Sequence, residues 1–290
     1  MRGSEFSHVF VIHYHIEDFQ LGTQQDAHEF FTFLIDAMDN ELKALSKEWE
    51  DHDRILQEER ERIKKADEAW EKYVPRKLKK PGRTWLSRLV EGRLSFETTC
   101  HECDRENNVV EPFLTISVDI FDGCHVAECL ERYCEREILS GSNQYFCENC
   151  GHHTNATRRT VFDQLPPIFV VHLKRFTYLD SRETCEINKY FDNFCRVQYL
   201  VISDRSIELK SKAQDSAVAY DLFAVVSHVG TSPNYGHYVA TTEVDGHWYR
   251  CDDDTATMVC NVSAELGDEY TYGNPDSYIL FYRMTSIMRL

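Results

Sequence analysis

A histidine and several carboxylates fall within one segment whose pattern predicts a β-hairpin. Residues 234–254 read NYGHYVATTEVDGHWYRCDDD, with an Asp245-Gly246 dipeptide between two runs of alternating apolar residues, which is the strongest short-range hairpin signal. In the register of a two-residue turn, His237 is opposite Asp254 and diagonal to Asp252, at about 7 Å between Cα atoms. Side chains alternate along a strand, so the three share one face. A histidine near a carboxylate is the base and orienting half of a nucleophilic triad, and this geometry leaves either aspartate as the partner.

The hairpin supplies no nucleophile of its own. The chain contains eleven cysteines, but its first 99 residues contain none. Cys251 is adjacent to Asp252, yet strand alternation points it to the opposite face from His237. His228 ends another strand-like segment and is expected to be structural, whereas Gly236 would allow a neighbouring chain to approach the backbone closely.

Four other cysteines have the spacing of a metal site. Cys100 and Cys103 form one C-x2-C pair, and Cys147 and Cys150 form a second, with 43 residues between the two pairs. Zinc favours four tetrahedral thiolates, so we expect a structural Zn²⁺ that joins the ends of two hairpins, and four cysteines leave no open position for catalysis. The remaining cysteines show no metal spacing: Cys124, Cys129, Cys134, Cys185, Cys195, Cys251 and Cys260.

The N-terminal third is expected to be helical. Residues 24–45 carry apolar side chains one helical turn apart, which predicts an amphipathic helix with Thr23 as its cap. Those side chains are Phe30, Leu34, Met38, Leu42 and Leu45. Residues 47–79 are densely charged, and their apolar stripe is too thin for a coiled coil, so a solvated helix is expected there. Pro75, Pro81 and the KLKKPGR run indicate a linker.

Strand-like segments dominate from Arg93 onward, with one short helix predicted in HVAECLERYCERE. The IFVVHL run, residues 168–173, is nearly continuously apolar, as expected of a strand that is buried on both faces. The sequence therefore predicts an α+β fold with three segments: 1–46, a charged helical insertion or linker at 47–83, and 84–290.

Composition limits the partners. The 290 residues carry a formal charge of −17, which argues against nucleic acid and anionic membranes and favours a basic partner. No apolar run reaches the roughly 20 residues needed to span a bilayer. Cysteine-rich chains without a signal peptide are typical of reducing compartments, so a cytoplasmic or nuclear location is expected.

These motifs together resemble the catalytic domain of the ubiquitin-specific proteases, which are papain-like cysteine deubiquitinases with fingers, palm and thumb. The motifs occur in the family's order over about 260 residues. They are TQQDAHEF (23–30), the paired C-x2-C knuckles, LPPIFVVHLKRF (165–176), YDLFAVVSHVG (220–230), GHYVA (236–240), WYRCDDD (248–254) and SYILFY (277–282). PNYGHYVA and YGNPDSYILFYR most resemble the small branch that WD-repeat proteins activate.

The resemblance implies roles for individual residues. His237 matches the family's general base and Asp252 its orienting residue, so the resemblance selects Asp252 over Asp254, with Asp253 as an auxiliary. The four knuckle cysteines match the zinc site of the fingers. In the QQDAHEF box, Gln25, Asp26 and Glu29 match positions that bind the ubiquitin tail, whose arginines suit an acidic chain. Ubiquitin, its conjugates and a WD-repeat activator are therefore the expected partners.

One departure from the family pattern is serious. The family's nucleophile lies in an Asn-x-Cys box well upstream of the QQDAHEF box, whereas the 23 residues before Gln24 contain neither cysteine nor asparagine. The expectation is a deubiquitinase domain without its nucleophile and without most of its thumb. The alternative is a module that binds ubiquitin or a WD-repeat protein and does not cleave.

Overall fold

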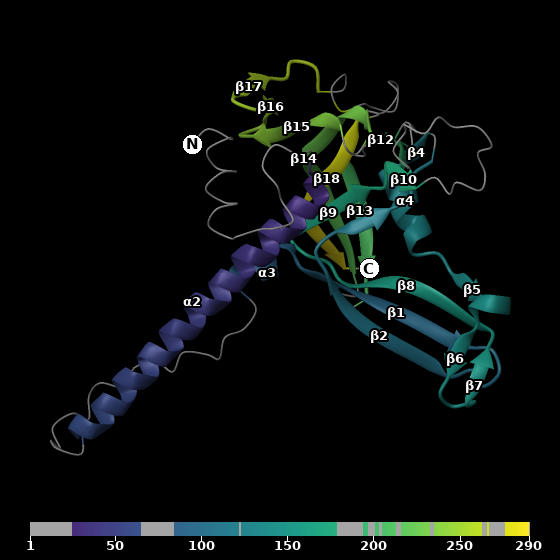
Figure 1. Ribbon diagram of the computed structural model, residues 1–290, viewed down its shortest axis with the longest axis horizontal. Helices are drawn as coiled ribbons and strands as arrows, with labels where there is room; N and C mark the ends of the chain where they lie inside the picture. Colours follow the sequence, from purple (N-terminus) through teal and green to yellow (C-terminus); the bar gives the residue numbers. More distant parts are fainter. Residues whose placement is uncertain are drawn as a thin grey trace. The chain divides into compact units, whose positions relative to one another are not determined.

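The computed structural model describes most of the chain after Gln24. The described residues are 25–64, 84–121, 123–178, 194–196, 201–202, 205–212, 216–232, 235–262, 266 and 276–289. The chain divides into two compact units, Phe30–Leu89 and the remainder. Both helices and sheets are present (Figure 1), which confirms the predicted α+β class.

The smaller unit is helical. It contains α2 (Ala27–Lys64), apart from the first three residues of that helix, and most of α3 (Trp85–Val90). Ile35 and Asp39 are buried, whereas Met38 and Leu45 are 37% and 51% exposed. The buried face is therefore rotated by one position from the predicted stripe, and α2 continues through residue 47, where the sequence suggested a change of segment. The predicted cap Thr23 lies outside the described residues.

A polar contact joins the two helices within this unit. The Thr84 hydroxyl donates to the Asp39 carboxylate, and the same Thr84 oxygen accepts a hydrogen bond from the Ser87 backbone N–H at 3.0 Å. Thr84 thus caps α3 and fixes α3 to α2. Lys43 lies one turn further along α2, and its Nζ is 2.6 Å from Asp39 Oδ2, where it balances the carboxylate charge.

The larger unit is built on an eight-stranded sheet. Its order is β17-β16-β15-β14-β18-β9-β3, with β13 also paired to β14, and only β3 and β9 run parallel. The strands are β3 (Ile116–Val118), β9 (Ile168–Leu173), β13 (Ser206–Ser211), β14 (Ser216–Ser232), β15 (Tyr235–Val244), β16 (His247–Asp252), β17 (Thr255–Met258) and β18 (Ser277–Arg289). β9 lies inside the sheet between β18 and β3, which explains its unbroken apolar sequence.

A second sheet carries the cysteine knuckles. Its order is β2 (Glu106–Phe113), β1 (Gly92–Cys100), β8 (Ala156–Gln164) and β5 (Glu137–Leu139), and the hairpin β6 (Tyr145–Cys147)–β7 (His152–Thr154) lies near its far end (Figure 1). β2 was not predicted, because ENNVVEP is polar and contains Pro112. It is an edge strand, exposed up to Phe113, where a proline and polar side chains are tolerated.

Aromatic packing joins the two sheets. Phe113 of β2 and Phe162 of β8 both contact Phe169 of β9, with ring centroids 6.1 and 5.7 Å apart, and Phe169 also contacts Tyr220 of β14 at 5.6 Å. Gly92 is required beside this cluster, because a Cβ there would lie 2.3 Å from the Phe113 ring.

Short elements complete the larger unit. They are β4 (Cys124–His125), α4 (Val126–Tyr133), the 3-10 turn Gly141–Asn143, β10 (Phe176–Tyr178), β11 (Phe194–Arg196) and β12 (Val201–Ile202). No helix in the described part of the chain has the length and apolar content required to cross a bilayer.

Candidate active site

The predicted hairpin is β15–β16. Its register runs from Ala240–Cys251 to Val244–His247, as expected for a two-residue turn. Asp245 and Gly246 have φ values of 50° and 77°, and these positive angles are those of a type I′ turn. The hairpin register predicted from the sequence is confirmed.

Beyond Cys251 the chain departs from a simple hairpin. Asp253 has a φ of 46°, and the chain turns there into β17, which pairs back onto β16 from Asp252–Thr255. Asp254 therefore lies in a turn rather than on a strand facing His237, and the β15–β16 pairing ends at Ala240–Cys251. The expectation that Asp254 lies opposite His237 is wrong, because the turn signal of three consecutive aspartates was not recognised.

The structure brings His237 and Asp252 into direct contact. His237 Nε2 lies 2.6 Å from Asp252 Oδ1, and both side chains are nearly half exposed. When Nε2 donates its hydrogen to the carboxylate, Nδ1 carries the lone pair and can accept a proton. The exposed Asp253 lies within 4.8 Å of both groups. The arrangement has the chemistry of a general base held by a carboxylate.

Gly236 has a packing role beside this pair. A Cβ at Gly236 would lie 2.3 Å from Nε2 of His228, whose side chain is only 1% exposed. The His228 ring also contacts the rings of Tyr238 and Phe176. The close approach that the sequence suggested at Gly236 is therefore made by a buried imidazole, which fixes the backbone immediately before His237.

The QQDAHEF box forms the start of α2. Asp26 Oδ1 accepts hydrogen bonds from the backbone N–H groups of His28 and Glu29 at 2.7 and 3.2 Å, so Asp26 is the cap of the helix. Its other oxygen accepts from the Tyr278 hydroxyl at 2.5 Å. Both carboxylate oxygens are engaged within the protein, whereas Glu29 is exposed and Gln25 is half-buried. The roles of these three residues in substrate binding stay a prediction.

A stacked histidine pair lies next to this cap, and sequence reasoning missed it. The rings of His28 and His172 are 4.0 Å apart and nearly parallel. His28 Nε2 contacts Thr115 Oγ1 at 2.8 Å, and His172 Nδ1 contacts Ser117 Oγ at 3.0 Å. Burial, with a smaller contribution from His28, lowers the pKa of His172 to about 4. The pair packs the first turn of α2 against β9, and burial disfavours the protonated form of both rings by lowering the pKa of each.

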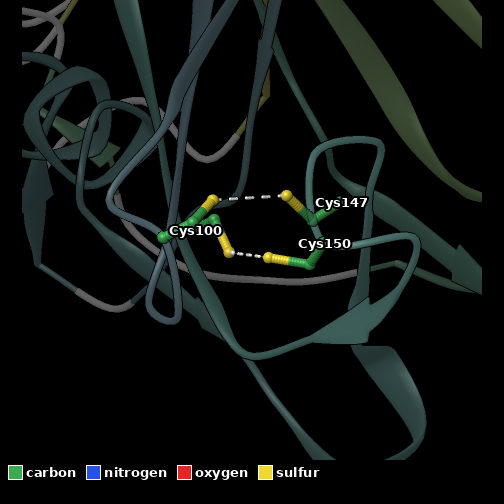
Figure 2. Close-up of side chains that lie close together, drawn as sticks. Cys100, Cys147 and Cys150 are labelled. Atoms are coloured by element: carbon green, nitrogen blue, oxygen red, sulfur yellow. Dashed lines mark hydrogen bonds between the residues drawn. The ribbon is translucent and has the colours of Figure 1, made fainter.

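The four knuckle cysteines come together as predicted. Figure 2 shows the sulfurs of Cys100, Cys147 and Cys150 turned toward one another. The Sγ atoms of Cys100 and Cys150 are 3.9 Å apart, and those of Cys103 and Cys147 are 3.6 Å apart. Four sulfurs at about 2.3 Å from a central zinc would be about 3.8 Å from one another. The cluster therefore fits a closed tetrahedral metal site.

Neighbouring groups act in opposite directions on two thiols of this cluster. The Thr154 hydroxyl contacts Cys100 Sγ at 3.2 Å, and this hydrogen bond is the main cause that lowers the pKa of the Cys100 thiol to about 6. Burial and the surrounding sulfurs raise the pKa of the Cys150 thiol. Four thiolates at this spacing repel one another, and a divalent cation removes that repulsion.

Solved structures share this fold. The chain is similar to the SAGA Ubp8/Sgf11/Sus1/Sgf73 DUB module bound to ubiquitin aldehyde, with a TM-score of 0.65 and 22% identity over 98% of this chain and 55% of that chain. It is also similar to the SAGA DUB module with a substituted Ubp8 bound to monoubiquitin, with a TM-score of 0.61 and 23% identity over 91% of this chain and 49% of that chain. The present chain thus spans about half the length of these solved chains.

Curated proteins and a family model give the family. The chain is 28% identical to ubiquitin carboxyl-terminal hydrolase 4 of Arabidopsis thaliana, over 92% of this chain and 71% of that protein. It is 29% identical to ubiquitin carboxyl-terminal hydrolase 12 of Salmo salar, over 90% of this chain and 67% of that protein. The model of ubiquitin carboxyl-terminal hydrolases matches residues 7–282. With this match over nearly its whole length, the chain belongs to the ubiquitin carboxyl-terminal hydrolase family, whose members are cysteine-type deubiquitinases.

Proposed function

We propose that the protein to which this chain belongs removes ubiquitin from protein conjugates by thiol-dependent hydrolysis. The observation that carries this proposal is the 2.6 Å contact between His237 Nε2 and Asp252 Oδ1 on the adjacent strands β15 and β16. A base held by a carboxylate is the arrangement that accepts a proton from a nucleophile, so its presence favours catalysis over binding alone.

The proposed mechanism assigns each group one task. His237 accepts the thiol proton at Nδ1, and Asp252 holds the Nε2–H tautomer and stabilises the imidazolium. The thiolate attacks the carbonyl of ubiquitin's terminal glycine, the amine leaves with the proton from His237, and water hydrolyses the acyl-enzyme. No cysteine precedes Cys100 in this sequence, so the thiol of the proposed reaction is not assigned to a residue of this chain. Asp253 assists as an auxiliary acceptor.

Substrate recognition is proposed at the start of α2. Gln25, Asp26 and Glu29 would contact the basic ubiquitin tail, and the net charge of −17 favours its approach. Because the structure engages both oxygens of Asp26, the exposed Glu29 is the better candidate for a direct ion pair. Asp26 then acts by fixing the first turn of the helix.

The metal at the knuckles is proposed to be Zn²⁺. Cys100, Cys103, Cys147 and Cys150 would hold it, and its effect is structural, since four sulfurs leave no position for water or substrate. Held there, the metal would join the end of β1 to the β6–β7 hairpin, which also contacts the β1–β2 turn through His152 and Glu102. Zinc therefore stabilises the end of the sheet and takes no part in the reaction.

Partners and location follow by analogy. The SAGA module places a similar chain among further protein subunits, and we infer that this chain also works with protein partners. The resemblance to the WD-repeat-activated branch makes a WD-repeat protein the first partner to test, in a cytoplasmic or nuclear setting.

Labelling with ubiquitin that bears a thiol-reactive C-terminal group tests the proposal. We would compare the intact mass of this chain with that of a form extended by its native upstream residues. The extended form should gain one ubiquitin, His237→Ala should abolish the gain, and Asp254→Asn should leave it unchanged as a matched control. Tight ubiquitin binding without labelling of either form would instead identify the non-catalytic binding module.

A further inference from the structure

Two cysteines outside the active site and the metal site lie in contact. Cys124 begins β4, two residues before α4, and Cys129 lies on the second turn of that helix, with their sulfurs 3.3 Å apart. Their side chains are 0% and 2% exposed. Relative to the cap His125, they occupy the flanking positions that form a hydrophobic staple at a helix start. Both side chains therefore pack at the start of the helix, but two thiols at this distance have a chemistry that apolar staples lack.

We propose that Cys124 and Cys129 are a modification site, a dithiol that peroxide oxidises to an intramolecular disulfide. The sulfurs must approach by little more than an ångström to reach the bond length of about 2.05 Å. Both residues belong to one short segment that is already folded around the helix cap, so closure requires only small side-chain rotations. This inference does not rest on the proposed deubiquitinase activity.

The local hydrogen bonds distinguish the two thiols. The Cys129 S–H donates to Cys124 Sγ at 3.3 Å, and the backbone N–H of Phe121 donates to the same sulfur at 3.5 Å. The bond from Cys129 is the main cause that lowers the pKa of Cys124 to about 7. The same bond, together with burial, raises the pKa of Cys129. Cys124 is therefore the nucleophile and Cys129 the resolving thiol.

A cavity gives a small oxidant access to the pair. It has a volume of about 230 Å³, and Cys129 forms part of its wall together with the charged side chains of Asp119, Arg132 and Glu135. A cavity with charged walls holds water, and hydrogen peroxide is similar to water in size and polarity. The oxidant can thus reach the wall that Cys129 forms, and the Cys124 sulfur lies 3.3 Å behind it.

The reaction balances with hydrogen peroxide as the oxidant. The Cys124 thiolate attacks one peroxide oxygen, the O–O bond breaks, and the other oxygen leaves as water after protonation, giving a sulfenic acid on Cys124. The Cys129 sulfur then attacks Cys124 Sγ and displaces hydroxide, which takes the Cys129 proton and leaves as water. Two thiols are oxidised to one disulfide, and one peroxide is reduced to two water molecules.

Peptide mapping tests the proposal without relying on activity. Trypsin releases residues 106–132 with Cys124 and Cys129 as their only cysteines, and residues 133–136 with Cys134 alone. We would treat the zinc-loaded chain with graded hydrogen peroxide, alkylate the remaining thiols and digest without reductant. The 106–132 peptide should lose two hydrogens and accept no alkyl group, and reductant should restore two alkylation sites.

Cys134 is the internal reference. Burial raises the pKa of its thiol to about 11, so the disulfide should form at peroxide levels at least about tenfold below those that oxidise Cys134. Cys129→Ala should remove the disulfide and leave Cys124 as a sulfenic acid, whereas Cys134→Ala should change nothing. A 106–132 peptide that still carries two alkyl groups once Cys134 is oxidised would overturn the proposal. A disulfide that is lost in Cys134→Ala would overturn it as well.

Discussion

Acidification should destabilise the larger unit through the His28–His172 pair. Among the described residues no hydrogen-bond partner meets His172 Nε2, which is buried, and protonation there would bury an unpaired N–H beside a second imidazole. His172 therefore keeps a folded-state pKa of about 4, mainly because of burial, against an ordinary value of 6.5. Lys174 adds to this effect, whereas Asp26 opposes it. Burial lowers the pKa of His28 in the same direction.

The sign and size of the effect follow from proton linkage. Between pH 6.5 and about 4 the unfolded chain binds a proton at residue 172 that the folded chain does not, so the free energy of unfolding falls as the pH falls. Above pH 6.5 both states are neutral and the effect vanishes. Taking the pH from 8 to 5 should cost about 2 kcal/mol from His172 alone.

Urea unfolding at pH 8, 7, 6 and 5 measures this loss in the wild type and in His172→Asn. Asparagine keeps a polar contact to Ser117 but does not titrate, so the variant should lose about 2 kcal/mol less than the wild type over this range. Protonation of the cysteine cluster is common to both proteins and cancels in the difference. His247→Gln, at an exposed hairpin residue, is the matched control. The reasoning would be refuted if the wild type and His172→Asn lost the same free energy of unfolding between pH 8 and 5, to within about 0.5 kcal/mol.

Three further predictions concern the site. Gly236→Ala should destabilise the protein by about 2 kcal/mol in urea unfolding, because the new Cβ would lie 2.3 Å from the buried His228 ring; an unchanged unfolding midpoint would contradict this packing. Cys103→Ser should lower bound zinc from one ion per chain, measured by atomic absorption, whereas Cys260→Ser should not. In a form that carries its native upstream residues, Asp252→Asn should slow hydrolysis of a fluorogenic ubiquitin substrate at least about a hundredfold with the fold retained; a rate near wild type would remove Asp252 from the mechanism.

The strongest local signals in the sequence determined the elements that carry the site. The Asp245-Gly246 turn fixed the β15–β16 register, because a type I′ turn, with two positive φ values, matches the twist of a two-residue hairpin. The unbroken apolar run of β9 predicted a strand inside a sheet. The two C-x2-C pairs predicted a sulfur cluster, because two knuckles can satisfy a tetrahedral metal only by meeting. Family membership followed from the order of such motifs along the chain.

Tertiary structure decided the features that depend on contacts between distant residues. The turn at Asp253 leaves Asp252 beside His237 and carries Asp254 away, although strand alternation alone placed both aspartates on one face. The cap at Asp26 and its bond to Tyr278 join positions 252 residues apart, and nothing local to either residue signals the other. The stacking of His28 on His172 and the position of the His228 ring against Gly236 likewise arise only when strands and helix pack. Periodicity reports which face of an element is apolar, but the partner that covers that face, and the pKa that results, depend on the folded arrangement.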